Sequence, residues 1–148
     1  MRWIHDVSTD ADDPPPFVAL REVRLACANG ADYSGLSADE HRKRYPDLQT
    51  SVFNQPLAQV FGTALAFADA LNWNVAAAIE HEGRIEATAT TPLLRFKDDV
   101  VIRIRVFGNT SRLDIRSASR IGSSDLGANA KRIRTFLDNL NSSLKTNT

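Results

Sequence analysis

The chain has 148 residues, the size of one domain, and a chain of this length can bury enough surface to fold without a metal or a disulfide. Its single cysteine, Cys27, excludes an internal disulfide, and its 18 basic and 18 acidic residues give a formal net charge of zero. No run approaches the ~20 apolar residues that span a bilayer. No cationic and apolar leader follows Met1, so we expect a soluble chain with no transmembrane segment.

Charge is unevenly distributed along the chain. Residues 1–50 contain six basic and nine acidic residues, whereas residues 95–134 contain ten basic and four acidic ones. The asymmetry is typical of a basic surface that meets an anionic partner. It also fits an acidic N-terminal part that lies against a basic C-terminal part, and the sequence leaves both interpretations open.

Residues 1–47 are predicted to form an irregular N-terminal arm that packs on a core domain, residues 48–148. The stretch "STDADDPPPF" contains three consecutive prolines, which exclude a helix interior and favour an extended path. Apolar residues such as Trp3 and Phe17 are scattered through the arm. A purely disordered tail would lack them, so we expect the arm to pack on the domain.

Two short elements are expected next along the chain. Residues 37–44 predict a helix in which Ser37 is the N-cap and Glu40 completes a capping box. Residues 48–53, "LQTSVF", fit a short strand. This strand would add a fifth member to the four strands that come later in the chain.

A long amphipathic helix separates this strand from the others. Asn54 can cap the helix, and Pro56 suits its first turn. Apolar residues then recur at helical spacing, at Leu57, Val60, Phe61, Ala64, Phe67, Ala68 and Leu71. Asn72 marks the expected end of the helix.

Four antiparallel strands come next as a meander, because apolar and polar residues alternate in each of them. In the first hairpin the three-residue loop "HEG" places Gly83 at a positive φ and sets Ile79 opposite Ile85. In the second hairpin the two-residue turn "GN" sets Ile104 opposite Leu113. A slip of one residue would bring charged side chains into the apolar face, so this register is strongly specified.

The last element is a helix whose apolar stripe runs from Leu126 to Leu144, with Ser124 or Asp125 as its cap. The elements together predict an α+β fold of two layers. Its four- to five-stranded antiparallel meander sheet would carry two helices on one face, with the irregular arm outside.

The sheet face away from the helices is predicted to be polar and rich in arginine. The second hairpin makes Arg103–Asp114 a cross-strand ion pair and places Arg105 opposite Arg112. Two like charges there favour a bridging anion from a ligand or partner, or a bridging carboxylate of Glu86 or of the arm. The residues with which this face and its surroundings would bind a ligand are Arg103, Arg105, Arg112, Arg116, Arg120 and Arg132.

The link between the fourth strand and the last helix, "SRIGSSDLG", is interpreted as a polar latch. Asp125 can cap the helix, and a carboxylate already at that helix N-terminus disfavours a bound phosphate. Asn129 and Arg132 share one face of the helix and can reach back toward the link. The residues assigned to the latch are Asp114, Ser119, Gly122, Ser124, Asp125, Gly127 and Asn129.

No catalytic residue, metal or cofactor is predicted. His5, His41 and His81 lie in unrelated segments without ligand spacing, and no "GxSxG" motif occurs. Asp98 and Asp99 are neighbours on a strand, so their side chains would point to opposite faces. The alternative is a hydrolase-like enzyme of unknown substrate that would use clustered groups, namely Asp98, Asp99, Asp114 and the serines near Ser117.

Two stretches, "RFKDDVVIRIRV" and "SRLDIRSASRIGSSDLGANAKRIRTFL", resemble a bacterial and plant family of unknown function, domain-of-unknown-function family 1499. The upstream "IHDVSTDADDPPPF" and "YPDLQ" are similar to that family's N-terminal features. The resemblance implies no activity, catalytic residue or cofactor. Many bacterial members resemble extracytoplasmic domains behind membrane helices or a leader. This chain would then be either a soluble member or a domain excised from a longer envelope protein.

These observations predict a non-catalytic binding or interaction module with an unknown ligand or protein partner. Its basic sheet face would meet an anionic group on a lipid, a metabolite or a protein. Nucleic-acid binding is not expected. The exposed positions on the central strands carry Arg, Thr, Asp and Glu instead of the aromatic residues that stack on bases.

Overall fold

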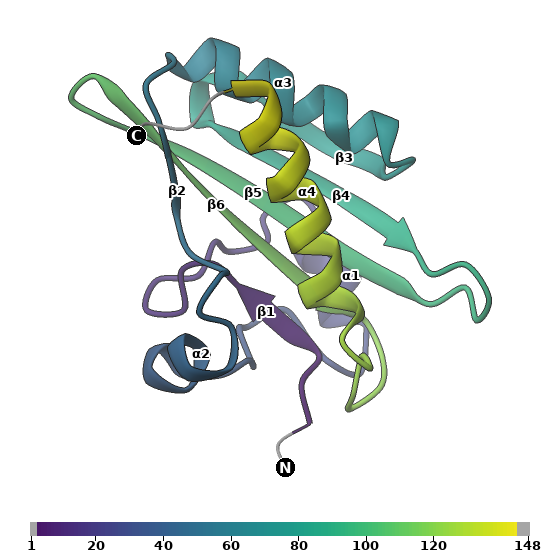
Figure 1. Ribbon diagram of the computed structural model, residues 1–148. Helices are drawn as coiled ribbons and strands as arrows, with labels where there is room; N and C mark the ends of the chain where they lie inside the picture. Colours follow the sequence, from purple (N-terminus) through teal and green to yellow (C-terminus); the bar gives the residue numbers. More distant parts are fainter. Residues whose placement is uncertain (1–2, 145–148) are drawn as a thin grey trace.

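A computed structural model of the chain describes residues 3–144 (Figure 1). Six antiparallel strands form one sheet in the order β1-β6-β5-β4-β3, and β2 pairs with the same edge of β6 as β1. The strands are β1 (Asp6–Ser8), β2 (Ser51–Phe53), β3 (Asn74–Ile79), β4 (Arg84–Thr90), β5 (Lys97–Phe107) and β6 (Thr110–Ser119). The helices are α1 (Arg21–Leu25), α2 (Ala38–Arg44), α3 (Leu57–Ala70) and α4 (Ala128–Leu144), with a 3₁₀ turn, η1, at Glu80–Glu82. This is the predicted α+β class, with six strands in place of four or five.

Helices α3 and α4 lie on one face of the sheet, as predicted (Figure 1). Phe61 of α3 and Ile133 of α4 pack there on the apolar side of the strands, which includes Ile85, Ile102 and Leu113. These five side chains are all buried. The alternation of apolar and polar residues in the strands therefore sets which face the helices cover.

The N-terminal arm covers the opposite face of the sheet, where α1 lies in Figure 1. Phe17 and Leu20 pack on Val101 of β5 and Ala118 of β6, and they form a second, smaller core. The prediction of two layers is therefore incomplete, because the arm adds a partial third layer on the other face of the sheet. The sequence did not predict β1 or α1, since each is short and is stabilised by residues remote in the chain.

The β5–β6 hairpin has the predicted register. Ile104 lies opposite Leu113 and Arg103 opposite Asp114, and Gly108 in the turn has a φ of +59°. The apolar pattern and the turn residues favour the same pairing, and the structure confirms it.

The predicted register is wrong for the β3–β4 hairpin. Ile79 lies opposite Arg84 instead of Ile85. Glu80 joins the 3₁₀ turn, so the loop is one residue longer than "HEG". Gly83 has the predicted positive φ, +64°, and a Cβ on it would lie 2.1 Å from the carbonyl oxygen of Ile104. The turn residue was therefore identified correctly although the loop length was not.

The helix ends obey local rules in part. Helix α2 has the predicted capping box, in which Oγ of Ser37 accepts a hydrogen bond from the backbone N of Glu40 (3.3 Å). Helix α3 has Pro56 at its N-cap in place of Asn54, and it ends before Asn72, whose φ is +62°. Within residues 3–144, no helix has both the length and the apolar character that crossing a membrane requires.

Helix α4 begins at Ala128, two residues after the start of the predicted stripe. Oδ1 of Asp125 accepts from the backbone N of Gly127 (2.7 Å), and Oδ2 accepts from that of Asn129 (3.2 Å). This turn precedes the helix and leaves Leu126 outside it, 91% exposed and with a φ of +53°. Asp125 therefore caps the helix as predicted, whereas the assignment of Leu126 to the buried stripe is wrong.

Candidate functional site

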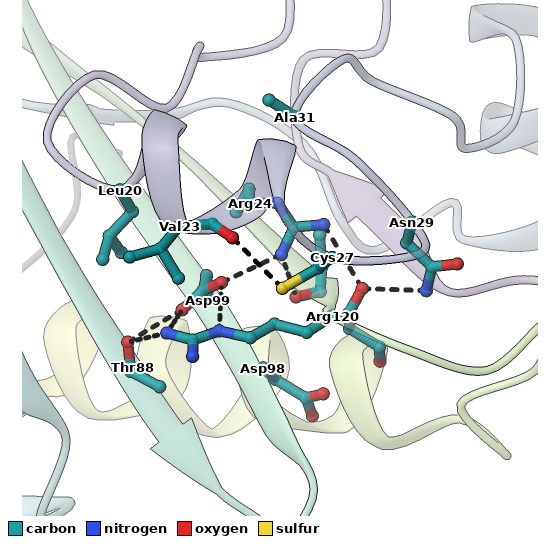
Figure 2. Close-up of polar contacts among 12 residues, drawn as sticks. Leu20, Val23, Arg24, Cys27, Asn29, Ala31, Thr88, Asp98, Asp99 and Arg120 are labelled. Carbon is teal, nitrogen blue, oxygen red and sulfur yellow. Dashed lines mark hydrogen bonds and ion pairs between the residues drawn. The ribbon is translucent and has the colours of Figure 1, made fainter.

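Asp99 of β5 is the centre of a buried cluster on the arm side of the sheet (Figure 2). Nη1 of Arg24 donates to its Oδ2 (3.0 Å), and Oγ1 of Thr88 donates to its Oδ1 (2.8 Å). Nε and Nη2 of Arg120 donate to Oδ2 and Oδ1, both at 2.9 Å. The hydrogen bonds to Asp99 raise the pKa of Arg120 above its ordinary value, so this guanidinium stays charged.

The remaining donors of Arg24 bind the main chain. They reach the carbonyl oxygens of Ala118 (3.0 Å), Ser119 (3.2 Å) and Gly30 (2.9 Å). The guanidinium also lies 4.8 Å from the ring centroid of Phe17. Arg24 therefore ties α1 to the end of β6.

Arg116 of β6 forms a second buried pair, with Asp6 of β1. Its Nε and Nη2 donate to the two carboxylate oxygens of Asp6, at 3.0 and 2.9 Å. Nη1 and Nη2 also donate to the carbonyl oxygens of Pro15 and Ala31, each at 3.1 Å. Arginine suits this position because its planar fork binds a carboxylate through two bonds and keeps donors for other acceptors.

Glu86 of β4 accepts hydrogen bonds from three consecutive backbone N–H groups of the arm. They belong to Val18 (2.9 Å), Ala19 (2.7 Å) and Leu20 (3.1 Å), which directly precede α1. The carboxylate is fully buried and also pairs with Arg84. Glu86 therefore satisfies donors at the start of a short helix that has no side-chain cap of its own.

Arg103 and Arg105 pair with carboxylates of the arm and of β6. Nη2 of Arg103 lies 3.2 Å from Oδ2 of Asp10, and Nη2 of Arg105 lies 3.6 Å from the same atom. Asp13 and Asp114 are within 4 Å of both guanidinium groups. Carboxylates of this chain therefore neutralise Arg105. They do not bridge Arg105 to Arg112, the cross-strand pair for which the sequence predicted a bridging anion or carboxylate.

The arm covers much of the sheet face for which a basic binding surface was predicted, but Arg112 and part of Arg105 remain exposed. Of the six arginines assigned to ligand binding, Arg112 alone has no carboxylate partner within residues 3–144. Arg112 is exposed, and its guanidinium lies 4.2 Å from the ring centroid of Phe107. The other five neutralise acidic groups of the chain itself.

Asp98 points to the opposite face of β5 from Asp99, toward the start of α4 (Figure 2). Its Oδ2 lies 2.9 Å from Nη1 of Arg132 of α4. Asp98 is buried and Arg132 is partly exposed, but no donor of the described residues is aligned for a hydrogen bond to this oxygen. The predicted divergence of the two aspartates is thus present, and each has an arginine of its own.

Asn129 of α4 connects the polar groups around Asp98. Its Nδ2 donates to Oγ of Ser119 (2.9 Å) and to Oδ2 of Asp125 (2.8 Å). Its Oδ1 accepts from Oγ of Ser117 (2.6 Å). These side chains join β6, the β6–α4 link and α4.

The latch residues of the link lie together, apart from one. The carbonyl oxygen of Gly122 accepts from Asn29 (3.0 Å), and Oγ of Ser124 accepts from the backbone N of Leu126 (3.3 Å). Gly127 has a φ of +84°, which suits glycine at the turn before α4. Asp114 lies farther along β6 beside Arg103, so it does not belong to the latch around the link.

A pocket of about 430 Å³ opens beside this network at the end of the sheet. It lies between the β4–β5 connection and the β6–α4 link. Its walls are mainly apolar and comprise Pro92, Leu93, Leu94, Phe96, Ile121, Leu126 and Ala128. Asp98 and Ser119 are buried residues of its lining, and Asp125 lines it near the start of α4. We take this pocket, with Asp98 and Arg132 beneath it, as the candidate functional site.

The groups of the enzyme alternative are spread over the molecule. Asp98 and Asp99 lie on opposite faces of β5, and Asp114 pairs with Arg103. Ser117 is fully buried and bonded to Asn129. Within residues 3–144, no group of three or more His, Cys, Asp and Glu side chains is placed to hold a metal ion.

Reasoning from the sequence did not identify the pocket. Two of its exposed wall residues, Leu93 and Leu94, belong to the β4–β5 connection. The available signal is the apolar character of "PLLRF" between two strands, where a surface turn normally carries polar residues.

The fold and its ion pairs define a class of protein: an α+β domain in which a charged N-terminal arm is fastened across an antiparallel sheet. A family model described as "Protein of unknown function (DUF1499)" matches residues 6–140, and the chain belongs to this family. No curated protein matches the chain.

Proposed function

We propose that the protein is a non-catalytic binding module whose ligand is a small amphiphile held in the pocket at the end of the sheet. The ligand would have an apolar body and a head group that donates a hydrogen bond. The observation that carries this proposal is the position of Asp98 in the lining of an apolar pocket. Its Oδ2 is buried and accepts no hydrogen bond from residues 3–144.

The apolar body is supported by the size and walls of the pocket. Its volume of about 430 Å³ is that of a typical small-molecule site. Leu94, Phe96 and Ile121 are wall residues that remain partly exposed to solvent. An alkyl chain or ring placed among them would remove apolar surface of both the ligand and the protein from water. Each buried CH₂ group would contribute about 0.8 kcal/mol to the free energy of binding.

The head group is supported by the charges of the lining. Oδ2 of Asp98 lies 2.9 Å from Nη1 of Arg132 but has no donor aligned with it, so it can still accept a hydrogen bond from a ligand. Arg132 neutralises Asp98 and holds the carboxylate in place. The charged residues of the lining are both acidic, Asp98 and Asp125. A neutral or cationic head is therefore favoured over the anionic group expected from the sequence.

Isothermal titration calorimetry with three eight-carbon amphiphiles tests this proposal. Octylamine has donors on its head, octyltrimethylammonium has the same charge without donors, and octanoate is anionic. We expect octylamine to bind at least about tenfold more tightly than either of the others, because only its head can donate to Asp98. Equal affinity for all three would contradict the assigned head group.

A pocket-filling variant supplies the second test. Ala128→Phe places a ring in the pocket and should abolish octylamine binding. Ala66→Phe is the matched control, because Ala66 is an exposed residue in the middle of α3. Binding that survives Ala128→Phe in a protein with an unchanged circular dichroism spectrum would place the ligand elsewhere.

A further inference from the structure

We propose that the rim of the pocket docks on a bilayer that contains anionic lipids. We define the rim as the exposed apolar residues of the two connections, Leu93, Leu94, Phe96, Ile121 and Leu126. Their side chains would enter the interfacial layer of the membrane, while Arg95 and Lys97 meet lipid phosphate groups. The rim is the outer edge of the pocket, so docking does not depend on which ligand the pocket holds.

The rim gathers exposed apolar side chains at one end of the molecule. Leu93 is 94% exposed, Leu126 91% and Leu94 71%, and Phe96 and Ile121 are also exposed. All five line the same pocket, so they form one patch instead of scattered single residues. Contiguous exposed apolar patches mark interaction sites, because leaving them in water is unfavourable.

Hydrogen bonds inside the two connections satisfy backbone groups behind these side chains. The backbone N of Phe96 donates to Oγ1 of Thr91 (2.8 Å), and that of Thr91 donates to the carbonyl oxygen of Phe96 (2.9 Å). The backbone N of Leu126 donates to Oγ of Ser124 (3.3 Å). Paired backbone groups matter at a membrane, since unpaired ones are costly in its apolar region.

The charges of the rim fit an anionic surface. Arg95 and Lys97 are exposed and alternate with the apolar residues of the β4–β5 connection. The acidic residues nearby are already engaged, since Asp98 is buried against Arg132 and Asp125 holds the start of α4. A basic and apolar rim combines two signals, insertion and charge attraction, which together bind a membrane more stably than either alone.

Trp3 extends the same surface toward the N-terminal arm. It is 66% exposed and lines a pocket together with Leu126 and Arg44. Tryptophan is enriched at the membrane–water interface, where its ring is apolar and its N–H is hydrated. A bilayer that contains anionic lipids therefore matches the apolar rim, Arg95 and Lys97, and Trp3.

Vesicle co-sedimentation tests the proposal with the whole chain. We expect binding to vesicles of phosphatidylcholine and phosphatidylglycerol, and at least about tenfold weaker binding to phosphatidylcholine alone, as loss of charge attraction requires. Binding should also shift the fluorescence of Trp3 to shorter wavelength, because Trp73, the second tryptophan, is buried. The absence of binding to the anionic vesicles would overturn the proposal.

Variants of exposed residues locate the surface without threatening the fold. Leu93→Ser with Leu94→Ser should weaken vesicle binding at least about tenfold. Val106→Ser is the matched control, because Val106 is 59% exposed beside the β5–β6 turn and lies outside the rim. Equal binding by the leucine double variant and the parent chain would reject the rim as the docking surface.

Charge variants and the pocket variant distinguish membrane docking from ligand binding and from self-association. Arg95→Glu with Lys97→Glu should abolish binding to anionic vesicles, whereas Arg112→Glu, on β6, should leave it unchanged.

Ala128→Phe should abolish octylamine binding yet retain vesicle binding, so the two proposals fail independently. A rim-dependent dimer in analytical ultracentrifugation, with no vesicle binding, would assign the patch to a second copy of the chain and overturn membrane docking.

Discussion

At the scale of single residues, the protein depends on arginines that are almost entirely removed from water. Arg24 is 1% exposed and Arg116 is 2% exposed. Burial of a guanidinium is costly unless a carboxylate and further acceptors replace its hydration. Asp99 and Asp6 supply the carboxylates, and backbone carbonyl oxygens supply the additional acceptors. These side chains therefore hold the chain together and are not available to a ligand.

Removal of one such arginine should strongly destabilise the folded protein. Arg116→Ala leaves the Asp6 carboxylate buried without its partner, so we expect the free energy of unfolding in urea to fall by about 3–5 kcal/mol. Arg112→Ala is the control on the same strand, and an exposed side chain should cost less than about 0.5 kcal/mol. Similar losses for the two variants would contradict the structural role assigned to the buried pair.

His41 should make stability depend on pH. Burial lowers its pKa below the ordinary value of 6.5, against the attraction of Asp47. The unfolded chain therefore binds this proton at a higher pH than the folded chain does. The free energy of unfolding is therefore unaffected by His41 above a pH of about 6.5, where the residue is neutral in both states. It falls as the pH drops from there toward the lower pKa of the folded state, because protonation then favours the unfolded chain.

His41→Phe removes this titration. The difference in the urea midpoint between a pH of about 7.5 and a pH of about 5.5 should be smaller in the variant than in the parent chain. Identical differences in the two proteins would show that His41 does not contribute. The comparison within each protein cancels any general effect of the substitution on packing.

At the scale of elements, α1 is a five-residue helix that could not persist alone, and the sheet supplies what it lacks. Glu86 of β4 satisfies the N–H groups before its first turn, and Arg24 ties its last turn to β6. The β6–α4 link is fastened in a similar way by Asp125 and Asn129. Short segments are thus ordered by a few polar and charged side chains that bond to the main chain or to neighbouring elements.

Glu86→Ala should release the arm locally. Three backbone donors would lose a charged acceptor, and hydrogen bonds to charged groups contribute about 1.5–3 kcal/mol each. We expect amide hydrogen exchange of residues 18–25 to accelerate at least about tenfold, with little change in β5 and β6. Glu82→Ala, at an exposed partner of Arg84, is the control and should leave the exchange of the arm unchanged.

At the scale of the whole molecule, the arm and the sheet behave as one unit because ion pairs join residues far apart in the chain. Asp6 and Arg116 are 110 residues apart in sequence, and Arg24 and Asp99 are 75 apart. Contacts of this separation couple the order of one segment to that of the other.

Unfolding should therefore be a single transition. The ring of Trp73 stacks on that of Phe136 with centroids 5.4 Å apart, so its fluorescence reports on the core between the sheet and the helices. The measurement uses the Trp3→Phe variant, in which Trp73 is the single tryptophan. Its fluorescence midpoint in urea should coincide with the loss of exchange protection in residues 18–25. Earlier loss of protection in the arm would show that it is an independent segment.

Local patterns in the sequence determined the elements of the core domain. Alternation and a two-residue turn established the β5–β6 register, and helical spacing established α3 and most of α4, because these signals act between near neighbours. The same rules failed at the β3–β4 turn, where one extra loop residue shifts the strand pairing, and at Leu126, where a turn delays the start of α4.

Only the tertiary structure decided what the polar residues do. The sequence could show that arginines and acidic residues are unevenly placed, but it could not pair Asp10 with Arg103 or cover the polar face with the arm. The pocket likewise arises because two connections, residues 91–96 and 120–127, meet at one end of the sheet. Such contacts depend on the path of the whole chain, and no local propensity records them.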